Sequence, residues 1–180
     1  MRNITALRVL PKTRLILTAV AGLMFLAFTF PASAAIPNQG PVAIVVGGVD
    51  EMHIMSAQVI FINQLRTSGY RVVDESTLNQ MRRSEAGRLA LQGDVKAILN
   101  LSSRYGISTF ITAYITAGRP VVNEFQLYTG TATIAVQARR GADLIYGDTV
   151  SGRQVGYSRD EAAQKSIETA AVLAARNLTN

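Results

Sequence analysis

A short, unbroken apolar run, Val42–Val46, constrains the fold more than any other segment of this chain. It ends at Gly47-Gly48, which fits the length of a strand better than that of a helix. A strand that is apolar on both faces is typical of the centre of a sheet with layers on both sides. We therefore expect this strand to be central in its sheet, with helices on one or both faces.

The residues after this run predict a βαβ unit. Asp50 is placed to cap a helix, and apolar residues then recur at helical spacing up to Arg66. Gly69 has the position of a C-cap glycine, and Tyr70–Val73 is the next expected strand. The two strands should be parallel and joined by a right-handed crossover. The expected inner positions of the helix are Met55, Val59, Ile62 and Leu65, with Ile60 and Phe61 widening the stripe.

Two further helices are expected before the pattern changes to strands. The first starts at Asp74 or Ser76 and includes Leu89, and the second spans Val95–Tyr105 and stops at Gly106. Side chains then alternate between apolar and polar in three stretches. These stretches predict a three-stranded antiparallel meander: Ser108–Ala117, Phe125–Ala138 and Asp143–Gly156.

Glycines and a capping signal add detail to this half. Arg140-Gly141 is expected at a hairpin tip, and Gly147 and Gly152 at bulges or close approaches. Ser158 and Glu161 form a capping box for a C-terminal helix that reaches about Leu178. The apolar stripe of this helix is mostly alanine, so we expect the helix to pack closely on the sheet.

These elements predict an α/β fold with α+β character. One mixed sheet should hold the βαβ unit and the meander, packed by helices that include the alanine-rich C-terminal one. The sequence contains no cysteine and no tryptophan, so the core must rely on aliphatic burial.

The first 34 residues have the order of a secretory signal peptide. Four basic residues precede the uncharged apolar run Leu15–Phe30, and Ala32-Ser33-Ala34 supplies a small-residue cleavage site. We expect a leader at 1–34, one domain at 35–180, and a periplasmic or secreted location. The alternative is an uncleaved leader, which would be the only membrane attachment, because no cysteine is present for a lipid anchor.

The charge of the chain gives no reason to expect nucleic acid as a partner. Four of its 18 Lys and Arg residues lie in the leader, which leaves 14 against 12 Asp and Glu, a net charge of +2. Nucleic-acid binding requires a clustered basic face. Phosphate-loop and dinucleotide motifs are also absent, so we expect no cofactor.

The acidic residues after the first two strands are the only candidates for metal ligands. Asp50, Glu51 and His53 follow the first strand, and Asp74 with Glu75 follows the second. The carboxyl ends of parallel strands are common ligand sites, so these groups could converge on a cation. The simpler interpretation is that Asp50 and Asp74 cap helices and that no metal binds.

Aromatic residues gather in the meander half of the chain. Tyr114, Tyr128 and Tyr146 are candidates for an interaction surface, together with Phe125 and Tyr157. The alternative is that they pack against each other as cross-strand pairs.

The order of segments resembles a group of bacterial envelope domains. The matching stretches are Val42–Gly47, Gly69–Asp74, Arg104–Ala113 and Ser158–Leu178. The group includes the amino-terminal domain of the TolB type, the middle domain of flagellar assembly protein T, the curli secretion channel subunit and penicillin-binding-protein activator lipoproteins. This resemblance implies a scaffold or regulator of envelope assemblies rather than an enzyme, and it carries over no site residues.

The expected function is therefore a non-enzymatic protein-interaction module of a cell-envelope complex, with protein partners that include further copies of this chain. The alternative is a periplasmic domain that binds a small ligand or cation at the loops after the first two strands.

Overall fold

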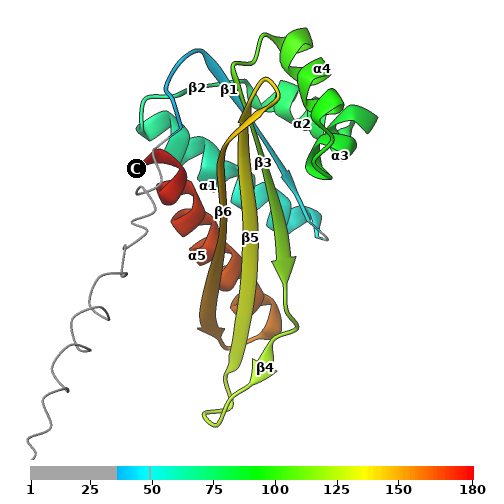
Figure 1. The fold of residues 1–180 in the computed structure, drawn as a ribbon. Helices are drawn as coiled ribbons and strands as arrows, with labels where there is room; N and C mark the ends of the chain where they lie inside the picture. The colour runs from blue at the N-terminus through cyan, green and yellow to red at the C-terminus, as the bar shows by residue number, and fades with distance from the viewer. Residues whose placement is uncertain (1–35, 49) are drawn as a thin grey trace, which may run out of the picture. The chain divides into compact units, whose positions relative to one another are not determined.

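The computed structural model describes residues 36–48 and 50–180, and the expected leader at 1–34 lies outside this part. Figure 1 shows the elements in chain order. They are β1 (Pro41–Gly47), α1 (Glu51–Thr67), β2 (Arg71–Val72), α2 (Glu75–Arg83), α3 (Glu85–Leu91), α4 (Val95–Tyr105), β3 (Thr109–Ala117), β4 (Val121–Val122), β5 (Tyr128–Arg140), β6 (Asp143–Gly156) and α5 (Arg159–Thr179). Among the helices described, none is both long and apolar enough to cross a bilayer.

The expected fold class is confirmed. The described strands form one six-stranded mixed sheet in the order β2-β1-β3-β5-β4, and β6 also pairs with β5. Strand β1 is parallel to β2 and β3, whereas β3, β4 and β6 are antiparallel to β5. The meander is thus β3-β5-β6, and the short β4 is an addition to the strands expected from the sequence.

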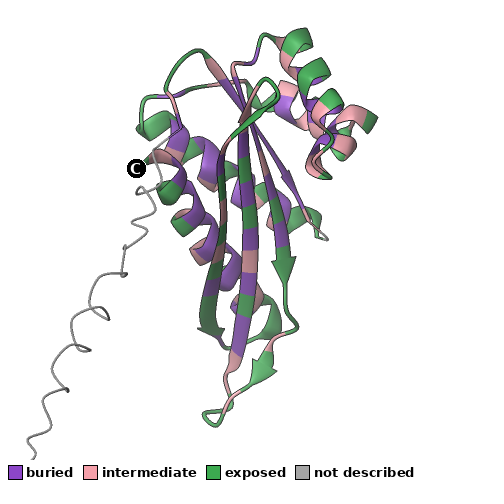
Figure 2. Cartoon of the chain, in the orientation of Figure 1, coloured by how far each residue is buried: buried purple, intermediate pink, exposed green. Residues whose placement is uncertain are grey.

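Strand β1 is the centre of the core. Every residue of Val42–Val46 is fully buried, as an apolar run with layers on both sides requires. Ile54 of α1 lies near Ile115 at Gly48, the residue after β1, and Leu91 of α3 lies near Tyr114 at Gly47, the last residue of β1. Ile115 and Tyr114 are consecutive in β3 and point to opposite faces, so the two helices cover opposite faces of β1. Figure 2 shows the buried residues following this sheet and the inner side of α5.

The inner face of α1 differs from the expected one. The structure buries Ile54, Ala57, Gln58, Phe61, Ile62 and Leu65. Met55 and Val59 are instead 54% and 50% exposed. The helix is rotated relative to the expectation because apolar side chains occur nearly all the way round it, so the pattern alone did not select one face.

The single helix expected to start at Asp74 or Ser76 and to include Leu89 is divided at Ser84. Ser84 has an extended backbone, ends α2 and caps α3 by accepting a hydrogen bond from the Gly87 N–H. Its hydroxyl also donates to the Met81 carbonyl at 2.6 Å. A serine that satisfies backbone groups on both sides explains the corner between the two helices.

Helix α5 packs on β5 and β6 at backbone distance. A Cβ placed on Gly130 would lie 2.2 Å from the Ala162 carbonyl oxygen, and one on Gly152 would lie 2.2 Å from that of Ser166. The expected capping by Ser158 is present, since its hydroxyl accepts from the Glu161 N–H. The Glu161 carboxylate accepts from the N–H of Tyr157, one residue before the N-cap, rather than from that of Ser158 as in a standard capping box. Small residues on both surfaces therefore form the close seam that the alanine stripe predicted.

Candidate functional site

Asp50 and Asp74 are helix caps in the structure. The Asp50 carboxylate accepts from the Met52 and His53 N–H groups at 2.9 and 3.2 Å. The Asp74 carboxylate accepts from the Thr77 N–H at 2.9 Å and from the Ser76 hydroxyl at 2.7 Å. Hydrogen bonds from the side chain of Thr77, then from Ser76 and the Thr77 N–H, lower the pKa of Asp74 from 3.8 to about 2.

We expect this cap to make the free energy of unfolding depend on pH in the acidic range. The Asp74 pKa is lower in the folded chain than in the unfolded one, so its stabilisation is present above pH 3.8 and is lost as the pH falls through about 2. An NMR titration of the carboxyl carbon should show the low pKa. Thr77→Val removes the hydroxyl but keeps the N–H, and it should raise the pKa of Asp74. Thr67→Val, at the exposed end of α1, is the control. An Asp74 pKa that is insensitive to Thr77→Val would contradict this account.

Glu51 and His53 have different neighbours. The Glu51 carboxylate accepts hydrogen bonds from both terminal nitrogens of Arg82, and the distance from Nη1 to Oε2 is 2.7 Å. These hydrogen bonds lower the pKa of Glu51. His53 Nδ1 lies 3.8 Å from Asp50 Oδ1. In the part of the chain that the structure describes, no three His, Cys, Asp or Glu side chains are grouped to hold a metal ion.

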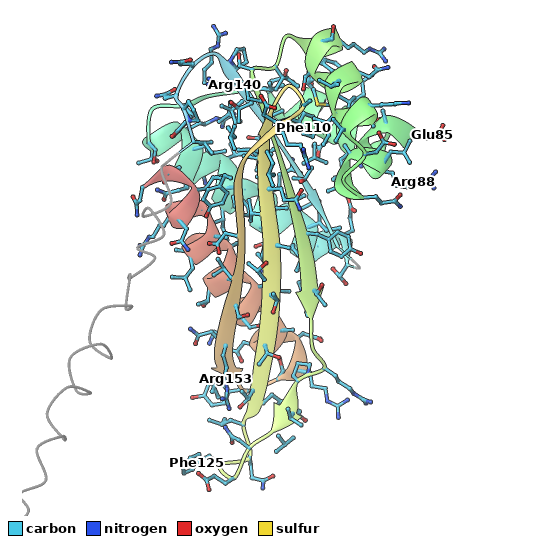
Figure 3. The ribbon with its side chains drawn as sticks, viewed as in Figure 1. Glu85, Arg88, Phe110, Phe125, Arg140 and Arg153 are labelled. Carbon is cyan, nitrogen blue, oxygen red and sulfur yellow. The ribbon has the colours of Figure 1, made fainter. Side chains whose placement is uncertain are left out.

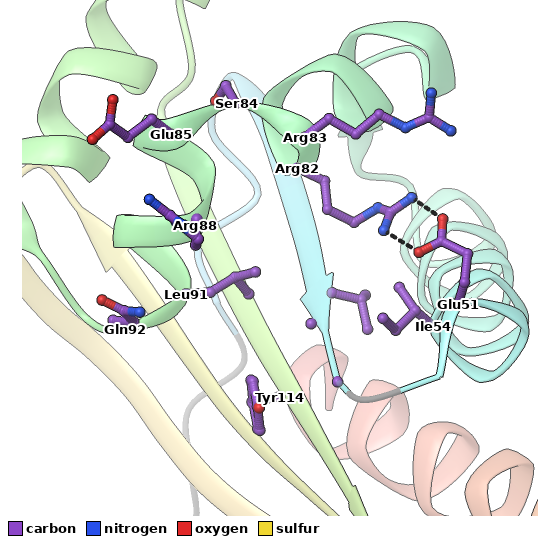
Figure 4. Close-up of a pocket in the computed structure, with 13 residues that line it drawn as sticks. Glu51, Ile54, Arg82, Arg83, Ser84, Glu85, Arg88, Leu91, Gln92 and Tyr114 are labelled. Atoms are coloured by element: carbon purple, nitrogen blue, oxygen red, sulfur yellow. Dashed lines mark hydrogen bonds and ion pairs between the residues drawn. The ribbon is translucent and has the colours of Figure 1, made fainter.

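A pocket of about 800 Å³ opens at the carboxyl end of β1. Gly47-Gly48, the start of α1, the α2–α3 corner and Tyr114 of β3 enclose it (Figure 4). Its apolar lining comes from Val46, Ile54, Leu91 and the Tyr114 ring. The alternative function expected a concave site beside Asp50 and Asp74. Glu51, which follows Asp50 in the chain, lines the pocket. Asp50, Asp74 and Glu75 do not line it.

The charged lining of this pocket is mainly arginine. Its ionisable side chains, Tyr114 aside, are Glu51, Arg82, Arg83, Glu85 and Arg88. Arg82 is only 11% exposed, and both of its terminal nitrogens bind Glu51. Within the described residues, Arg83 and Arg88 form no ion pair. The sequence indicated the loop after β1 but not the arginine lining, because the arginines come from a separate segment of the chain.

The three candidate tyrosines do not form one surface. Tyr114 is exposed on the face of the sheet away from α5, whereas Tyr146 is only 5% exposed and its hydroxyl donates to Asp148 Oδ2 at 3.2 Å. Tyr128 is partly buried at the start of β5, where the Arg159 guanidinium lies 5.7 Å from its ring centre. Of these three, Tyr114 alone is available to a partner as an exposed ring.

Exposed apolar side chains gather instead at the end of the β4–β5 hairpin. Val121 pairs with Thr129, and Thr129 pairs with Val155, so the three lie in one cross-strand row. Phe125, Thr129 and Val155 also line a common shallow hollow with Arg153. Figure 3 shows Phe125 at the tip of the hairpin and Arg153 on the neighbouring strand. We call Val121, Phe125 and Val155 the hairpin-end surface.

The loop that carries Phe125 is tied down by hydrogen bonds. The Asn123 side-chain oxygen accepts from the N–H groups of Phe125 and Leu127 at 3.0 and 3.1 Å. The backbone adds bonds from Asn123 N–H to the Leu127 carbonyl and from Gln126 N–H to the Asn123 carbonyl. Phe125 is nevertheless 73% exposed. The loop therefore has an ordered backbone and an aromatic side chain that is largely exposed to solvent.

No protein-family model and no curated protein sequence matches this chain. Its fold is similar to that of the lipoprotein GNA1162 from Neisseria meningitidis, with a TM-score of 0.52 and 11% sequence identity over 77% of this chain and 99% of that chain. It is also similar to the hypothetical protein CT253 from Chlamydia trachomatis, with a TM-score of 0.51 and 12% identity over 78% of this chain and 93% of that one.

At such low identity these likenesses show a shared fold and nothing further. The resemblance to bacterial envelope proteins is thereby confirmed at the level of the fold, since one of the two similar structures is that of a bacterial lipoprotein. The α/β domain described here is built on the same plan as that lipoprotein.

Proposed function

We propose that this chain is a non-enzymatic protein-interaction module that contributes to the assembly or regulation of a cell-envelope complex. In this proposal residues 1–34 are a leader, residues 35–180 are one domain, and the domain works in the periplasm or after secretion. Its partners are envelope proteins, with further copies of the chain among them.

The hairpin-end surface carries the proposal. Aromatic side chains are enriched in the cores of protein–protein interfaces, where a few buried anchors supply most of the binding energy. Phe125 is exposed on a loop that Asn123 already orders, so binding would cost little additional loop entropy. Val121 and Val155 extend the apolar area on both sides of Thr129.

The likeness to a lipoprotein supports the envelope location. GNA1162 is described as a lipoprotein, and nearly the whole of that structure is matched here. The leader-like order of residues 1–34 is consistent with export by a related route. Fold likeness does not name the complex, so the partner has to be found by experiment.

Site-specific photo-crosslinking in the native cell tests this function. A photoreactive residue at Glu124, in the hairpin loop, should form a discrete adduct, whereas one at Lys96, exposed on α4, should not. Purifying the adduct identifies the partner, and a second copy of the chain would be recognised by its mass. Equal labelling from both positions, or none from Glu124, would reject the hairpin-end surface.

The Phe125→Ser variant adds a quantitative prediction. We expect the adduct from Glu124 to fall by about tenfold or more, as for loss of an interface anchor. Leu144→Ser, at the exposed β5–β6 hairpin, is the matched control and should leave the adduct unchanged. Both replaced side chains are exposed, so both variants should retain the wild-type thermal unfolding midpoint.

A further inference from the structure

The pocket at the end of β1 has the size and lining of a small-molecule site. Its volume of about 800 Å³ lies within the range of roughly 300–1,000 Å³ typical of ligand pockets. It combines an apolar lining with a few charged groups, which is the usual composition of such sites. It shares no lining residue with the hollow at Phe125, so it is separate from the hairpin-end surface.

The apolar part is built around Gly47. A Cβ on this residue would lie 2.9 Å from Leu91 Cδ1 and 3.2 Å from Tyr114 Cδ2. The absence of a side chain therefore lets Leu91 and the Tyr114 ring meet the end of β1. Tyr114 remains 46% exposed, so its ring is accessible at the pocket. This arrangement offers a surface on which an aliphatic chain or a ring can lie.

The charge of the pocket selects the sign of the ligand. Glu51 and Arg82 neutralise one another through two hydrogen bonds that link α1 to α2. The remaining charged residues of the lining are two arginines, Arg83 and Arg88, and one acid, Glu85. A guanidinium group has the geometry to bind a carboxylate with two parallel hydrogen bonds. Because arginines exceed the remaining acid, a cation is disfavoured at this position.

We propose that this pocket binds a small organic acid, with its carboxylate on Arg88 and its apolar body against Leu91 and Tyr114. Arg83 is directed away from Arg88 (Figure 4), and it adds positive charge at the rim of the pocket. The site shares the loop after β1 with the cation site considered from the sequence, but Asp50 and Asp74 do not line it and its charge favours an anion. The proposal stands independently of the partner-binding role of the hairpin.

Titration with octanoate, monitored by the backbone amide resonances of residues 35–180, tests the site. The amide resonances of Gly47, Gly48 and Tyr114 should shift and saturate. Octylammonium has the same chain and the opposite charge, and it should cause no saturable shift there. Inorganic phosphate has charge but no apolar body, and it should bind more weakly than octanoate. Octylammonium or phosphate binding as tightly as octanoate would overturn the proposal.

The double variant Arg83→Gln with Arg88→Gln removes the two unpaired charges. Both side chains are exposed, so the fold should be kept, which a thermal melt can verify. We expect octanoate affinity to fall by about tenfold or more, as for loss of charge-assisted hydrogen bonds. Arg119→Gln, an exposed arginine outside the pocket, is the control and should bind as the wild type does. Unchanged affinity in the double variant would disprove the assignment.

Phe125→Ser should not alter octanoate binding. Failure of the pocket proposal is therefore distinguishable from failure of the proposed function.

Discussion

Gly152→Val is expected to lower the free energy of unfolding by about 3 kcal/mol or more, the upper part of the range for overpacking in a core. A Cβ at this position would lie 2.2 Å from the Ser166 carbonyl oxygen and 2.6 Å from the Ala170 nitrogen. Both atoms belong to the backbone of α5, so no side-chain rotation relieves the contact. Helix α5 must move away from β6 or the strand must bend.

Gly147→Val is the matched control for this prediction. Gly147 lies on the same strand, and the nearest atom to its added Cβ is Leu144 Cδ2 at 4.0 Å. Valine favours strands, so this change should remain within about 0.5 kcal/mol of the wild type. Urea unfolding followed by far-ultraviolet circular dichroism measures both variants. Equal losses in the two variants would show that α5 is not seated at backbone distance.

The α5 seam was accessible from the sequence because its cause is local. Alanines at helical spacing and a glycine in the facing strand both reduce the distance between a helix and a sheet. Gly152 was expected at a bulge or a close approach, and the structure shows the close approach. The irregular register lies instead between Ala138 and Arg139 of β5. Position within a strand can be read from alternation, whereas the exact place of a bulge cannot.

Neither candidate site could be assembled from the sequence. Arg82 and Glu51 are 31 residues apart, and their pairing depends on how α2 packs beside α1. The sequence pattern predicted one continuous helix through Ser84, and such a helix would place Arg88 and Leu91 differently relative to Arg82. Strand β4 contains only Val121 and Val122, which is too short for a pattern of alternation. The row formed by Val121, Thr129 and Val155 therefore became visible only with the pairing of the strands.

Phe61→Ala tests the rotation of α1 and is expected to cost about 3–5 kcal/mol of unfolding free energy. Phe61 is fully buried in the core between α1 and the sheet. Its removal takes away a large apolar surface and leaves a cavity that the neighbouring side chains fill only in part. The residue was expected at the border of the apolar stripe, but the structure places it among the largest buried side chains.

Val59→Ala, two residues earlier in the same helix, provides the comparison that decides the orientation of the helix. Val59 is half exposed, so truncating it should change stability by less than about 0.5 kcal/mol. Alanine is also the better helix former, which offsets part of the loss of apolar contact. If the stripe expected from the sequence were correct, Val59→Ala would be the costly member of the pair. Denaturant midpoints of the two variants at equal slope therefore distinguish the two orientations of α1.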